Sequence, residues 1–184
     1  MMKSTKMVAA TAATALNVTT SATTCTLAPY TGQPPLTAYD ALPARRLTEH
    51  FALREFVISA TAIRHGIDNT PPDDAVARLE VLCRAVLEPL RQRFGVIRVT
   101  SGYRSAEVNR LVGGAARSQH LSGEAADISI GSLEVGRKMY DYVRTRLDFD
   151  QLIFERNRKT GARWLHISYR SGGSNRRQAF ELAK

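Results

Sequence analysis

The sequence predicts an α+β fold in which N-terminal helices pack on a small, mainly antiparallel sheet. Apolar residues recur at helical spacing in the first half of the folded region, and short strand-like runs fill the second half. Helices that come early and strands that come late favour this class over alternating βαβ units. With 184 residues, the chain is long enough for one domain with a hydrophobic core.

The first 46 residues differ in composition from the rest. Residues 8–26 are almost entirely Ala, Thr, Ser and Val, and residues 29–43 are dotted with proline. A basic start before a short, weakly apolar run favours a secretory signal, whereas the low complexity favours an unstructured linker. We therefore expect a tail or weak signal over 1–46, a folded domain over 47–177 and a C-terminal tail over 178–184.

Helices are expected in the first half of the folded region. A short helix over residues 53–64 is closed by Gly66, and Asp73 suits the first turn of a longer helix. Pro89 should kink or split that longer helix, and Gly95 ends it. Its core face is marked by apolar residues at helical spacing: Val76, Leu79, Leu82, Val86, Leu90 and Phe94.

Strands are expected to dominate the second half. Ser105 and Ser132 can each cap a helix between strands. The polar turn over 156–162 joins the last two strands into a hairpin. The four runs with strand character are residues 96–100, 124–130, 149–155 and 163–169.

Composition excludes several classes of protein. The net charge of +9 favours polyanionic partners, but no nucleic-acid-binding signature accompanies it, so no specific nucleic acid is expected. Two cysteines do not make a disulfide scaffold; Cys83 fits a buried helical position, and Cys25 receives no role. No run approaches the ~20 apolar residues of a transmembrane helix. We expect a monomer without a transmembrane segment.

The most informative pattern is S-x-H-x-x-G-x-A-x-D, formed by Ser118, His120, Gly123, Ala125 and Asp127. Together with a histidine far downstream, His166, its histidine and carboxylate make a three-ligand set for Zn²⁺. Three protein ligands leave the fourth position open for water, which is the arrangement of a catalytic zinc. The pattern therefore predicts a hydrolase.

Strand periodicity supports this set. In a strand, alternate side chains share a face, so Ala125 and Asp127 point one way. Trp164, His166 and Ser168 likewise share a face of the last strand. Small residues beside Asp127 leave room for a metal and a substrate.

Each ligand also has a structural alternative. A single strand histidine such as His166 is commonly a hydrogen-bonded core residue, His120 alone fits a loop, and Asp127 fits a turn. Only the joint pattern favours a metal site. His50 lacks such a context, and His65 fits a helix C-terminus before glycine.

Three segments, SGYRS, SQHLSGEAAD and WLHISY, closely resemble the M15 zinc peptidases, in particular the M15A D-alanyl-D-alanine carboxypeptidase-like group. The resemblance covers roughly residues 47–177. It implies action on peptidoglycan peptides as a carboxypeptidase or endopeptidase, with related forms among phage lysins.

The resemblance also implies roles for individual residues. His120, Asp127 and His166 match the zinc ligands. Arg104 matches the arginine near the scissile carbonyl, where it can stabilise an oxyanion. Ser118 matches the motif serine beside the substrate.

The sequence departs from the family at the general base. Many M15 enzymes carry an acid three residues before the last ligand histidine, and this chain has Arg163 there. An arginine cannot act as that base. The nearest acids are Asp150 and Glu155, which lie five positions apart and so on opposite faces of an unbroken strand. We favour Glu155, with Asp150 as the alternative base. A purely structural role for Glu155, as a salt-bridge partner of a neighbouring arginine, stays open.

Two functions follow from these observations. The first is a zinc-dependent peptidase that hydrolyses peptidoglycan peptide bonds. The alternative is a catalytically weak or inactive wall-binding module that retains the zinc fold, supported by Arg163. We expect the protein in the periplasm or cell wall if residues 1–46 include a signal, and as a cytoplasmic phage-type lysin otherwise.

Overall fold

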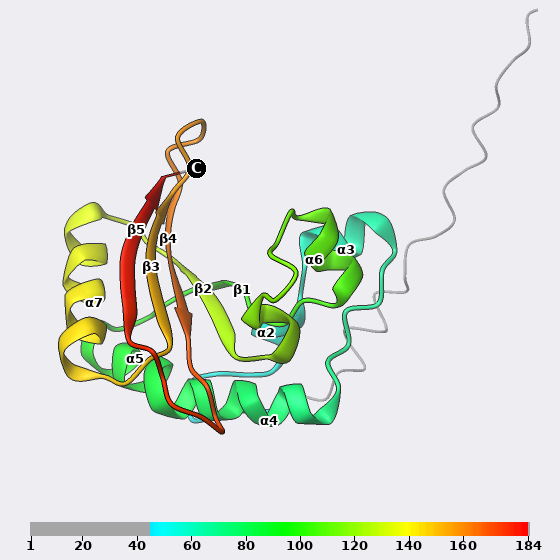
Figure 1. Ribbon diagram of the computed structural model, residues 1–184, viewed down its shortest axis with the longest axis horizontal. Coiled ribbons are helices and arrows are strands. Elements are labelled where there is room, and N and C mark those ends of the chain that lie inside the picture. Colours follow the sequence, from blue (N-terminus) through cyan, green and yellow to red (C-terminus); the bar gives the residue numbers. More distant parts are fainter. Residues whose placement is uncertain (1–44, 184) are drawn as a thin grey trace, which may run out of the picture. The chain divides into compact units, whose positions relative to one another are not determined.

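The computed structural model describes residues 45–183, which form the α+β fold drawn in Figure 1. The expectations of a tail or signal before residue 45, and the position of Cys25, lie outside the described residues. Among the helices within 45–183, none is both long and apolar enough to span a membrane.

The helices of the first half follow the predicted order, with one difference. The helix expected over 53–64 is divided into α2 (Arg54–Val57) and α3 (Ala60–His65), because Ile58 between them is extended, with φ −66° and ψ 120°. Ser59 then caps α3 by accepting a hydrogen bond from the Ala62 amide at 3.3 Å.

The long helix is divided at the predicted proline. It runs through α4 (Asp73–Leu82), a π-helical turn η1 (Cys83–Leu87) and α5 (Glu88–Phe94). Pro89 has no amide hydrogen to donate to the preceding turn, so a widened turn there is physically reasonable. Gly95 ends the helix with φ 79°, as expected. Cys83 is fully buried, as the sequence predicted.

The sheet has five strands in the order β1-β2-β4-β3-β5, and only the β3–β5 pair is parallel. The strands are β1 (Val99–Ser101), β2 (Ala125–Ser129), β3 (Gln151–Arg156), β4 (Arg163–Ser168) and β5 (Gln178–Ala183). The predicted hairpin is the β3–β4 pair. The predicted C-terminal tail is wrong for Gln178–Ala183, because this segment adds β5 to the edge of the sheet.

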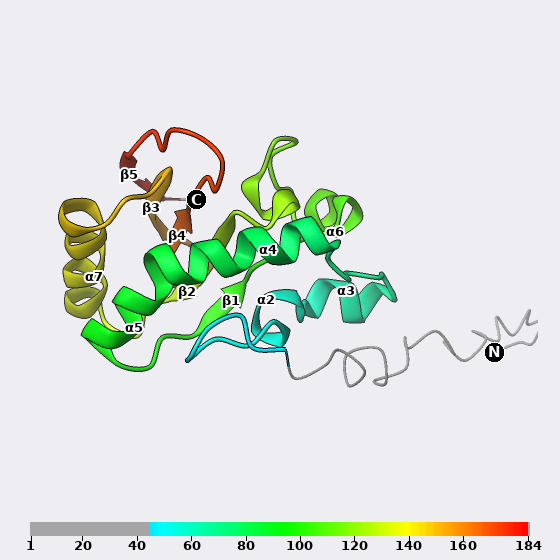
Figure 2. The same ribbon diagram turned by 90° about the horizontal axis from the view of Figure 1, so that it is seen from below.

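Three helical segments connect the strands: α6 (Ala106–Leu111), the 3₁₀ turn η2 (Gln119–Ser122) and α7 (Leu133–Arg146). The two predicted serine caps are confirmed, since Ser105 accepts from the Val108 amide and Ser132 from the Val135 amide. In Figure 1, α7 lies on one side of the sheet and α6 on the other, while α4 and α5 run beneath it, as Figure 2 also shows.

The two faces of the sheet have different roles. One face packs against α4, α5 and α7 in a single hydrophobic core, and its residues are Ala126, Ile128, Leu152, Phe154, Leu165 and Ile167. The opposite face carries Asp127, Ile153, Glu155, Trp164 and His166, which the strand register places side by side. The core therefore holds the sheet in place while its other face presents polar side chains.

Candidate metal centre

Two loops beside the sheet are joined by hydrogen bonds. The Arg104 amide donates to the His120 carbonyl at 3.0 Å, and Nδ1–H of His120 donates to the Gly102 carbonyl at 2.6 Å. Gly102 packs tightly on α2, because an added Cβ would lie 2.6 Å from the carbonyl oxygen of Phe56. The segment SGYRS is thus fixed against the segment that carries His120.

Asn69 secures the same loop from the other side. Its Nδ2 donates to the carbonyls of Val57 and Tyr103, and its Oδ1 accepts from the Ser105 amide at 2.7 Å. The side chain is buried and all these contacts are to backbone. Sequence reasoning missed this residue, because nothing local distinguishes it from an ordinary loop asparagine.

Gly123 allows the chain to turn between two of the predicted ligands. It has φ 75°, and an added Cβ would overlap the Ala75 carbonyl oxygen of α4. Only glycine tolerates both constraints. The turn brings His120 on η2 to the side of Asp127 on β2.

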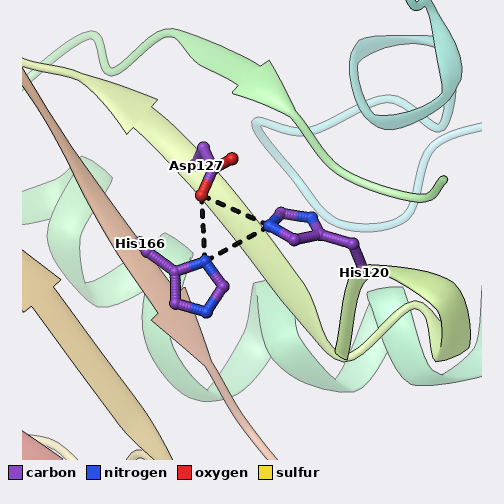
Figure 3. Close-up of side chains that lie close together, drawn as sticks. All are labelled: His120, Asp127 and His166. Atoms are coloured by element: carbon purple, nitrogen blue, oxygen red, sulfur yellow. Dashed lines mark hydrogen bonds and ion pairs between the residues drawn. The ribbon is translucent and has the colours of Figure 1, made fainter. Parts of the chain in front are cut away.

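The three predicted ligands meet at one point, as Figure 3 shows. Nε2 of His120 lies 3.2 Å from Nδ1 of His166 and 3.3 Å from Oδ1 of Asp127, and the His166–Asp127 distance is 2.9 Å. His166 is the cross-strand partner of Asp127. All three side chains are buried, with 2 %, 8 % and 9 % of the surface of His120, Asp127 and His166 exposed.

These distances fit a zinc ion. Ligand atoms ~2.0–2.1 Å from a tetrahedral zinc stand about 3.3 Å apart, close to the three separations above. Donation from Nδ1–H of His120 to a backbone carbonyl leaves the lone pair of Nε2 facing the other two ligands, which is the usual orientation of a zinc-bound histidine. The residues present therefore fit the metal.

The local electrostatics also favour a cation. Burial lowers the pKa of His120 from its ordinary value, although Asp127 opposes the change, and this direction favours the neutral imidazole. Burial alone would raise the pKa of Asp127, but the two histidines outweigh it and hold that pKa well below its usual range. Metal ligands must be in these deprotonated forms.

Arg104 holds the second carboxylate oxygen. Its Nη2 donates to Oδ2 of Asp127 at 2.6 Å, and its Nε donates to Oγ of Ser101 at 2.9 Å. Oδ1 is thereby left to face the histidines. The guanidinium is also at the wall of the cavity described next, so it stands between the Asp127 carboxylate and the space in that cavity.

A cavity of about 1020 Å³ opens over the three predicted ligands. Ser118, Arg104 and Glu155 line it, together with Trp164, the partner of Glu155 across β3 and β4. Glu155 is 5 % exposed and shares the face of His166, because Ile153 two positions earlier pairs with that histidine. The structure thus brings Glu155 to the site.

Asp150, the alternative base, lies elsewhere. It is fully buried and does not line the cavity. Oδ1 and Oδ2 accept hydrogen bonds from the backbone and guanidinium of Arg176, and Nε of Arg170 lies 3.2 Å away. Burial opposes ionisation of this carboxyl, but the hydrogen bonds from Arg176 lower its pKa below the ordinary value. Asp150 therefore behaves as a structural anion.

Arg163, at the position of the family's acid, also lies away from the site. It pairs with Arg156 across the hairpin and does not line the cavity. Three positions separate it from His166, so strand alternation puts the two side chains on opposite faces. The remaining histidines serve other purposes: His50 pairs with Glu88 at 2.8 Å, and His65 ends α3 before Gly66.

Comparison with known proteins places this site in a family. The model of the family described as peptidase M15 matches residues 49–168, more than half of the chain. The chain belongs to the peptidase M15 family. The matched region contains SGYRS, the motif with His120 and Asp127, and the strand with His166. Peptidases of this family are zinc-dependent in general. No curated protein matches the chain at a significant level.

Proposed function

We propose that this protein is a zinc-dependent peptidase of the M15A type that hydrolyses peptide bonds of peptidoglycan. The observation that carries the proposal is the spacing of His120, Asp127 and His166, which fits a tetrahedral metal at the base of an open cavity. A site with three protein ligands beside open space favours catalysis over a purely structural metal.

A zinc ion held there supplies Lewis-acid polarisation of a carbonyl and lowers the pKa of a coordinated water towards ~7. The residues around it divide the remaining tasks. Arg104 stabilises the negative charge that develops on the scissile carbonyl oxygen. Ser118, at the start of η2 and on the cavity wall, hydrogen-bonds the substrate.

Glu155 is the general base in this proposal. It takes a proton from the attacking water and delivers it to the nitrogen of the leaving amine. Its support is its position on the cavity wall and on the face of His166. Asp150 has weaker support, because its oxygens are engaged by Arg176 and its side chain is fully buried.

The alternative of a non-catalytic module loses its main argument. That argument was the absence of an acid at position 163. Arg163 lies outside the cavity, and Glu155 from β3 lines it. The arginine at position 163 is therefore no argument against catalysis. The net charge of +9 adds long-range attraction to an anionic cell wall, an effect that salt weakens.

Digestion of purified peptidoglycan tests the function. The zinc-loaded protein is expected to release peptide fragments that mass spectrometry detects, a chelator to stop the release, and added zinc to restore it. Bound zinc without any product would contradict the peptidase proposal and support the wall-binding module. The expected monomeric state and wall or periplasmic location are separate proposals, testable by light scattering and fractionation.

A further inference from the structure

A second cavity adjoins the one above the metal ligands. It has a volume of about 690 Å³ and shares Arg117, Ser118, Gln119 and Arg170 with the first. The segment 171–173 forms part of its wall. Space for a ligand therefore continues beyond the metal centre in this direction.

The boundary between the two cavities is rich in cationic groups. Arg117 is exposed and makes no ion pair with any residue between 45 and 183. Nε of Arg170 lies 3.2 Å from Oδ1 of Asp150, and that carboxylate already accepts three hydrogen bonds from the side chain of Arg176 and one from its backbone amide. Two guanidinium groups thus share one buried carboxylate, which leaves a surplus positive charge beside Arg117.

Farther out, the second cavity is lined by one arginine and one carboxylate. Arg78 pairs with Asp74 and donates to the Ser122 carbonyl at 2.7 Å. Glu124 accepts a hydrogen bond from Oγ of Ser122. The surplus positive charge therefore lies at the boundary, and the second cavity itself adds the carboxylate of Glu124.

We propose that Arg117 and Arg170 bind a carboxylate of a substrate peptide whose chain runs past the metal centre into the second cavity. The cleaved bond is then an internal one. The inference rests on the proposed peptidase function and extends it to the substrate. Guanidinium groups bind carboxylates through paired hydrogen bonds, and the boundary offers two such groups. An enzyme restricted to the last residue of a chain needs a site that closes beyond that residue, whereas here the space continues.

Binding measurements separate the two sources of such a carboxylate. The probe is a synthetic peptidoglycan stem pentapeptide in three forms: all carboxylates free, the internal glutamate amidated, or only the C-terminus amidated. Affinity is measured by fluorescence anisotropy with zinc-loaded Glu155→Gln, which is expected to bind without turnover. Amidation of the internal glutamate should raise Kd about tenfold, and C-terminal amidation less than about twofold.

Variants assign this effect to the two arginines. Arg117→Gln and Arg170→Gln, each added to Glu155→Gln, should weaken binding of the free peptide about tenfold and make it insensitive to internal amidation. Arg176 keeps its contacts with Asp150 in both variants. Arg144→Gln on α7, behind the sheet, removes the same charge and should change Kd less than about twofold.

Product analysis with the wild-type enzyme completes the test. Cleavage should give two fragments longer than one residue. Three results would each overturn the inference. The first is an affinity that responds only to C-terminal amidation, and the second is an equal loss of affinity for all three peptides in the arginine variants. The third is release of only the terminal residue. If the wild type cleaves nothing while the arginine-dependent binding persists, the peptidase function fails and the carboxylate subsite stands.

Discussion

Replacement of Glu155 by Gln isolates the proposed proton transfer. The amide has nearly the same shape as the carboxylate but cannot accept the proton of the attacking water. Loss of a general base costs about 10²–10⁴-fold in kcat, which corresponds to ~2.7–5.4 kcal/mol in the activation barrier. Glu155 is 5 % exposed and lies on the wall of the cavity, so we expect the upper half of this range.

The assay compares turnover with metal content. Wild type and Glu155→Gln are loaded with zinc, and release of peptide from purified peptidoglycan is followed alongside bound zinc per chain. The variant should keep its zinc, because Glu155 is outside the three-residue ligand set. Turnover within about threefold of wild type would refute the reasoning, since one lost base must cost far more. The matched control is Asp150→Asn directly before the same strand, which should retain turnover when folded.

Three further predictions concern stability. Asp150→Asn should lower the free energy of unfolding at pH 7 by about 2–3 kcal/mol, because it leaves Arg176 beside a buried neutral group; urea titration measures this. Because the folded pKa of Asp150 is lowered, the ionised carboxylate stabilises the fold above about pH 3.9, and this stabilisation is lost as the pH falls through the folded pKa. Equal stabilities of the wild type and Asp150→Asn at pH 7 would contradict the structural role of Asp150. Gly102→Ala should lower the free energy of unfolding by about 2 kcal/mol or more, because the new Cβ overlaps the backbone of Phe56. It should also weaken zinc binding, because the carbonyl of residue 102 orients His120. An unchanged melting temperature and zinc affinity would contradict this packing. Chelation of zinc from the wild type should lower the free energy of unfolding by ~4 kcal/mol relative to protein held at a thousand times the zinc Kd, and a melting temperature unaffected by chelator would exclude a metal that stabilises the fold.

The faces of the strands were predictable because strand alternation depends on local spacing. Alternation along a strand puts Asp127 and Ser168 on the faces that the sequence indicated, and the register then pairs Asp127 with His166. Glycine at position 123 marked the turn that joins His120 to the sheet. These features need no knowledge of how distant segments pack.

The missed features depend on contacts between distant segments. Strand β5 has mostly exposed residues and an edge position, so its sequence lacks the apolar run of a core strand. It forms because its backbone pairs with β3. Asn69 and Arg170 acquire their positions in the same way, from loops that meet only in the folded chain. The break between α2 and α3 at Ile58 could not be predicted, because neither glycine nor proline occurs there.

The central claim is that His120, Asp127 and His166 hold one metal ion, and zinc content tests it most directly. Wild type and His166→Ala are loaded with zinc, separated from free metal by gel filtration and analysed by mass spectrometry, with His65→Ala at the exposed end of α3 as the control. We predict one zinc per chain in the wild type and control, and a large loss in His166→Ala with the fold retained. A wild type that binds no zinc, or a His166→Ala protein that binds as much as the wild type, would contradict the claim.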